Sequence, residues 1–216
     1  MQGHDEIVAR VLTGFDVPSH RQDMVWVGPP EETPTGGFAK RGRIAKHLRR
    51  LSQVLQVPVR VTKDLSDLGA TLKLVDTPDE TELLIRVRPA HEFLDRRWYE
   101  VVVLHEFSHV IFAALRQHTG VARWAAARTR VSGTHSMPPR RIMEEIIVEL
   151  SAVLTYRELV PATEANVFDP CYTYLRRQLG DMSRYGLPWH MYPATVSYGL
   201  EKAQVLSDAL LRVSKL

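Results

Sequence analysis

The segment His105-Glu106-Phe107-Ser108-His109 has the residue types and the spacing of a catalytic metal site. His105 and His109 are four positions apart, so on an α-helix of 3.6 residues per turn both rings project from one face, about 6 Å apart. Two imidazole nitrogens at this separation can meet one zinc ion at about 2.0–2.1 Å each. Glu106 can reach a water molecule in the open fourth position and act as general base. The segment therefore predicts zinc-dependent hydrolysis, and the alternative is two exposed histidines on an ordinary helix.

A catalytic zinc ion needs a third protein ligand. The metzincin pattern would place a glycine at position 112 and a histidine at position 115, where this chain has Phe112 and Leu115. The gluzincin pattern instead takes a glutamate from a second helix, and Glu145 and Glu149 share one face of an otherwise apolar segment. We predict that Glu145 is the third ligand and that Glu149 accepts a hydrogen bond from the ring N–H of His105. The alternatives are Glu149 as the ligand, and acids that are merely exposed.

Peptide hydrolysis also needs a donor for the oxyanion that forms at the attacked carbonyl group, and tyrosine, histidine or arginine side chains can supply it. The spacing of the residues does not single one out. The candidates are Tyr156, Tyr174 and His190, followed by Tyr172 and His135.

The elements that must position these residues follow from apolar periodicity and from the places of Gly and Pro. A buried helix over residues 95–118 carries the histidines, and a helix over residues 140–159 carries the glutamates. Strands are expected over residues 57–62, 70–75 and 82–87, the last two as an antiparallel pair, with 82–87 as the edge strand that pairs with an extended substrate. Helices are also expected over residues 1–17, 38–56, 171–179 and 195–213 and near Trp124, with a loop over residues 27–37.

The composition is that of a globular protein, with 44% hydrophobic and 25% charged residues in 216. A single cysteine, Cys171, excludes an internal disulfide framework and favours a reducing compartment. The chain begins without a signal-peptide pattern and has no run of about 18 apolar residues, so we expect a cytoplasmic protein without a membrane span. We predict an α+β zincin of gluzincin type, with an N-terminal helix and loop in residues 1–37. Residues 38–216 would form the zinc metallopeptidase domain, with a small twisted sheet over the active-site helix and a helical C-terminal half.

Basic residues gather between positions 40 and 63, where no acidic residue occurs. Such a patch either binds nucleic acid or another polyanion, or is simply a solvated helix face. The alternative function is therefore a nucleic-acid-associated protein whose zinc domain is regulatory or structural, and a further one is a domain that keeps zinc without turnover. The patch comprises Lys40, Arg41, Arg43, Lys46, Arg49, Arg50, Arg60 and Lys63, and Arg123, Arg128, Arg130, Arg140 and Arg141 add to the basic character.

From about Trp98 to its C-terminus, the chain resembles the metallopeptidase domain of ArdC-type antirestriction proteins, which also occurs in phage and plasmid polyvalent proteins. The two zinc segments are similar to those of ImmA/IrrE-like peptidases as well, and this favours Glu145 as the ligand. The chain departs from the ArdC pattern at Cys171 and Gln178, where histidine and tryptophan are frequent. The resemblance implies a zinc-dependent peptidase associated with a phage or mobile element. It is carried by the zinc motif, by Glu144-Glu145-Ile146-Ile147-Val148-Glu149-Leu150-Ser151-Ala152, by Tyr174-Leu175 and by the alanine-rich stretch 203–210.

Overall fold

In the residues that it describes, the computed structural model combines helices with one small mixed sheet, which is an α+β arrangement. The helix predicted over residues 1–17 is described only at Ile7 and Val8, which are helical. The predicted loop 27–37 and the short helix near Trp124 lie outside the described residues. The structure describes residues 7–8, 42–62, 70–76, 81–89, 93, 96–115, 139–160 and 169–213.

Within the described part of the chain, three strands form the sheet, in the order β1-β3-β2. They are β1 (Val59–Val61), β2 (Ala70–Asp76) and β3 (Thr81–Val87). The predicted antiparallel pairing of β2 with β3 is confirmed, and Leu72 lies opposite Ile85. Both residues are buried, and β2 and β3 contact the helix α3 (Arg96–Leu115). The sheet thus covers one side of the helix that carries the two histidines.

The prediction that residues 82–87 form an edge strand is wrong, because β3 lies between β1 and β2. β1 pairs with β3 in parallel. Parallel strands are joined by a long crossover connection and not by a tight turn, so no turn pattern between them indicates the pairing in the sequence. Leu84 and Ile85 are adjacent, so their side chains point to opposite faces, yet both are buried. Consecutive buried positions are typical of a strand that is covered on both faces. The edges of the described sheet are therefore β1 and β2.

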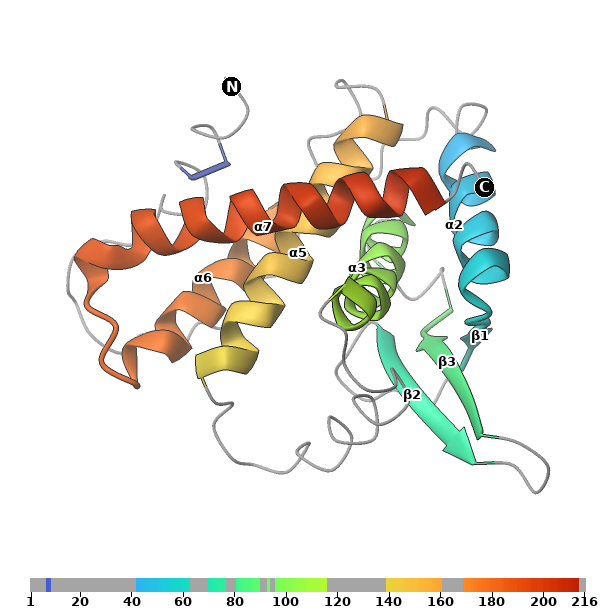
Figure 1. The fold of residues 1–216 in the computed structure, drawn as a ribbon, viewed down its shortest axis with the longest axis horizontal. Helices are drawn as coiled ribbons and strands as arrows, with labels where there is room; N and C mark the ends of the chain where they lie inside the picture. The colour runs from blue at the N-terminus through green and yellow to red at the C-terminus, as the bar shows by residue number, and fades with distance from the viewer. Residues whose placement is uncertain are drawn as a thin grey trace.

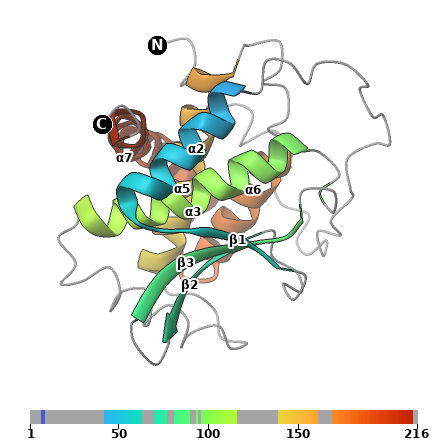
Figure 2. The ribbon, with the colours of Figure 1, turned by 90° about the vertical axis from the view of Figure 1, so that its right-hand side faces the viewer.

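Helix α2 (Gly42–Leu55) lies across α3 on the side of the molecule shown in Figure 2. Its buried residues Ile44, His47 and Leu51 recur at helical spacing. The helix ends at Leu55. The next residue, Gln56, has a left-handed φ of 53°, and Pro58, which predicts the end of the helix, follows two residues later. The predicted helix over residues 38–56 is thus confirmed from residue 42 onward, and its apolar face helps to cover the histidine helix.

Helices α5 (Pro139–Leu159) and α7 (Tyr192–Val213) cover the other side of α3 (Figure 1). Since α3 is enclosed in this way, its sides are largely apolar. The window Arg97–Leu115 has a mean hydropathy of 1.2, enough to cross a membrane by composition, but 72% of it is buried inside the fold. It therefore has the character of a core helix.

The C-terminal half is helical, as predicted, although α6 (Asp169–Ser183) is longer than expected and a 3₁₀ turn, η4 (Trp189–Met191), precedes α7. Helix α7 packs closely on α5 at Gly199. A Cβ atom there would lie 3.1 Å from side-chain carbons of both Ile146 and Leu150. The absence of a side chain at this position lets α7 support the helix that carries the glutamates.

Candidate metal centre

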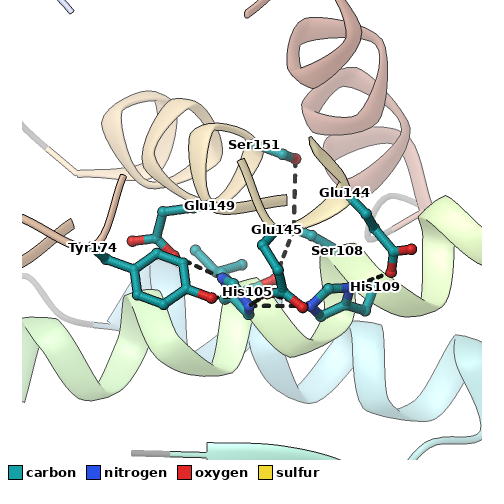
Figure 3. A network of polar contacts seen from close by, with 9 residues as sticks. His105, Ser108, His109, Glu144, Glu145, Glu149, Ser151 and Tyr174 are labelled. Atoms are coloured by element: carbon teal, nitrogen blue, oxygen red, sulfur yellow. Dashed lines mark hydrogen bonds and ion pairs between the residues drawn. The ribbon is translucent and has the colours of Figure 1, made fainter. Parts of the chain in front are cut away.

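His105 and His109 of α3 face Glu145 of α5, and the three side chains converge (Figure 3). The Nε2 atoms of the two histidines are 3.1 Å apart, and each lies 3.3 Å from Oε2 of Glu145. The centre is largely shielded from solvent, since the side chains of His105, His109 and Glu145 are 12%, 1% and 5% exposed. These residues could hold a metal ion, which is the arrangement that the spacing of the histidines and the position of Glu145 predict.

A carboxylate holds the outer nitrogen of each histidine ring. Nδ1 of His105 lies 2.7 Å from Oε2 of Glu149, and Nδ1 of His109 lies 3.0 Å from Oε1 of Glu144. Because a carboxylate only accepts hydrogen bonds, each Nδ1 donates its proton outward, and a neutral ring then has its lone pair on Nε2. The structure places Glu149 where the sequence predicts it. Glu144 was not predicted.

The three inner atoms suit a cation. Two Nε2 lone pairs and one carboxylate oxygen face each other at 3.1–3.3 Å, and a buried group of this kind requires a positive partner. The surroundings of His105 also favour positive charge. Burial lowers the pKa of His105, but hydrogen bonds to Glu145 and Glu149 outweigh this and raise the pKa to about 10. The centre therefore favours positive charge, and its donor atoms fit a metal ion.

Glu106 follows the first histidine on α3 and is itself buried, with 8% of its surface exposed. Its charge is one of those that raise the pKa of His105, which places it within electrostatic reach of the centre. No hydrogen bond or ion pair engages its carboxylate within the described part of the chain. Glu106 is therefore a buried carboxylate close to the centre whose oxygens are not engaged by another described residue.

Of the predicted oxyanion donors that the structure describes, Tyr174 is the one that lies at the centre. Its hydroxyl donates to Oε2 of Glu145 at 2.9 Å, and its ring meets the His105 ring edge-on, with centroids 5.8 Å apart (Figure 3). Burial and the charges of nearby glutamates raise its pKa well above 10, so the hydroxyl keeps its proton. Tyr156 instead donates to the buried Glu100 at 3.4 Å, and His190 is exposed in η4. Tyr172 is buried within α6, and His135 lies outside the described residues.

Comparison of the chain with protein-family models, with curated proteins and with solved structures finds no match. The similarity to ArdC-type and ImmA/IrrE-like peptidases stays a prediction from the motifs. The chemistry of the centre is therefore argued from its own residues.

Proposed function

We propose that this chain is a zinc-dependent metallopeptidase in which His105, His109 and Glu145 are the zinc ligands. The observation that carries the proposal is the set of donor separations, 3.1, 3.3 and 3.3 Å. A tetrahedral ion with bonds of about 2.0–2.1 Å separates its donor atoms by about 3.3–3.4 Å, and catalytic zinc keeps its fourth position for water or substrate. Magnesium and calcium prefer sites made of oxygen atoms, which two imidazoles do not provide.

When bound, a zinc ion supplies Lewis-acid chemistry, since it lowers the pKa of a water molecule toward about 7 and polarises a carbonyl group. Glu106 then accepts the proton of the attacking water and passes it to the leaving amine. Glu144 and Glu149 hold the imidazole rings in orientation through their Nδ1 protons. Tyr174 keeps its proton, and its hydroxyl, which donates to Glu145 in the structure, would donate to the oxyanion instead when substrate is bound. This division of roles is that of a gluzincin-type zincin.

The Glu106→Gln variant tests this proposal. The variant keeps all three proposed ligands, so we expect unchanged zinc content. It lacks the base, so we expect cleavage to fall by about 10²–10⁴-fold. Each protein is incubated with a peptide library, and new peptide termini are identified by mass spectrometry. Glu201→Gln, at an exposed glutamate of α7, is the matched control.

Cleavage that survives in Glu106→Gln would show that another group is the base. Wild-type protein that binds zinc but produces no new termini would support a domain that keeps the metal without turnover.

The basic surface of α2 and β1 favours the second candidate function, nucleic-acid association. Lys46, Arg49 and Arg60 have exposed side chains, α2 contains no acidic residue, and Arg60 lies opposite Arg86 in the β1–β3 pair. Binding to phosphates weakens steeply between about 50 and 200 mM salt. A gel-shift series without binding at the lowest salt concentration would eliminate this candidate. Lys40, Arg41 and Lys63 lie outside the described residues, as do Arg123, Arg128 and Arg130.

A further inference from the structure

Gln178 of α6 carries a buried polar atom that the metal centre does not use. The residue is 3% exposed, and its side-chain oxygen Oε1 is buried without a hydrogen-bond donor in the described structure. Buried amide oxygens nearly always accept a hydrogen bond, because burying one unsatisfied costs free energy. None of the described residues supplies the donor for Gln178, so a molecule bound beside it is a natural source.

The place of Gln178 in the fold links it to the centre. Gln178 follows Tyr174 by four positions, so the two side chains project from the same face of α6, one turn apart. Tyr174 reaches the centre directly, with its hydroxyl 2.9 Å from Oε2 of Glu145. Helix α6 packs against α5 and runs in the opposite direction (Figure 1). Gln178 is therefore nearer than Tyr174 to the beginning of α5. The face of α6 that contacts the centre therefore also presents an unsatisfied acceptor.

We propose that Gln178 is a substrate-binding residue, whose side-chain oxygen accepts a hydrogen bond from a main-chain N–H of a peptide held at the metal centre. This inference rests on the proposed peptidase function and adds to it the part of the substrate that is recognised. A peptide presents a donor at every non-proline residue, and a neutral amide oxygen accepts from it without requiring a charged side chain. The substrate class is thus a polypeptide, and Gln178 recognises its main chain and not its side chains.

The test removes the proposed acceptor, the side-chain oxygen of Gln178, and the proposed donor, a backbone N–H of a peptide probe. Each is removed alone, and then both are removed together. The probe is trileucine hydroxamate with its backbone N-methylated forms, and binding to the zinc-loaded full chain is measured by calorimetry. We expect Gln178→Met to weaken the unmethylated probe by about three- to tenfold, the worth of one hydrogen bond. Methylation of the contacting nitrogen should weaken binding to the wild type and have no further effect in Gln178→Met. Gln204→Met, at an exposed glutamine of α7, is the control, and Gln178→Leu replaces Gln178→Met if that variant does not fold.

Zinc content and melting temperature separate this role from a structural one. We expect both to be retained in Gln178→Met, because the substitution removes an unsatisfied atom from the interior and touches no proposed ligand. Equal affinity of wild type and Gln178→Met for every form of the probe overturns the inference and leaves a buried water molecule as the donor. Loss of zinc from Gln178→Met overturns it too, since Gln178 would then act on the metal centre. A zinc-loaded wild type that binds none of the hydroxamates contradicts the proposed function itself.

Discussion

Two glutamates that are not proposed ligands determine which nitrogen each histidine turns toward the metal centre. Glu144 and Glu149 lie on either side of Glu145 along α5, and each holds the Nδ1 of one ring. With both Nδ1 protons engaged, both Nε2 atoms face Glu145. Orientation of this kind raises the basicity of the ligands and reduces the freedom that they lose on binding a metal.

We predict that Glu144→Ala weakens zinc binding by about 10–100-fold, because His109 loses the acceptor that orients its ring. Glu144→Gln should retain most of the affinity, since an amide oxygen still accepts the Nδ1 proton. Affinity is measured by competition with a chromophoric chelator. Glu158→Ala, at an exposed glutamate of the same helix, is the control. If Glu144→Ala matches this control, Glu144 has no positioning role.

The sequence predicts Glu149 but not Glu144, and the reason is geometric. A search for a ligand and its outer partner considers positions four apart on one helix face, which pairs Glu145 with Glu149. Glu144 lies off that face. It reaches His109 because α5 runs antiparallel to α3, so the earlier glutamate meets the later histidine. The relative direction of two helices is set by the tertiary structure and cannot be inferred from local spacing. Two adjacent acids in an apolar segment do, however, indicate that both need a partner.

At the scale of elements, the sequence predicts each helix that builds the centre but not the order of the strands. Helices α3 and α5 have long apolar patterns with proline or polar boundaries, and such patterns are local. The position of β3 depends on a parallel partner, β1, of three residues, and a run that short carries little pattern of its own. The buried pair Leu84 and Ile85 is the local signal that would have indicated a central strand.

Helix α2 gives the molecule a pH dependence through His47. This residue is 6% exposed, its Nε2 has no hydrogen-bond partner among the described residues, and burial lowers its pKa from 6.5 to about 4. The unfolded chain therefore binds more protons than the folded chain between these two values. The contribution of neutral His47 is fully present above pH 6.5 and is lost as the pH falls toward about 4.

We predict that the wild type loses about 2 kcal/mol more unfolding free energy than His47→Leu between about pH 7 and about pH 5. Urea denaturation of both proteins at several pH values measures this difference. The other titrating groups are common to the two proteins and cancel in the comparison. Stability curves that stay parallel over this range would show that His47 is not held in its neutral form by the fold.

At the scale of the whole molecule, the centre exists only when the chain is folded. Its proposed ligands come from two helices, with His105 and His109 on α3 and Glu145 on α5. The sheet and α2 cover some sides of α3, and α5 and α7 cover others (Figures 1 and 2). The centre therefore lies in the core of the described fold. Metal binding should therefore be coupled to folding, because the unfolded chain does not hold these groups together.

Zinc stoichiometry measured by native mass spectrometry, on the wild type and on Glu145→Ala, tests the convergence of these three side chains most directly. We predict one zinc ion per wild-type chain, its retention in the exposed-site control Glu158→Ala, and its loss from Glu145→Ala under the same conditions. Equal zinc content in the wild type and in Glu145→Ala, or a wild-type chain that takes up none, would contradict the account.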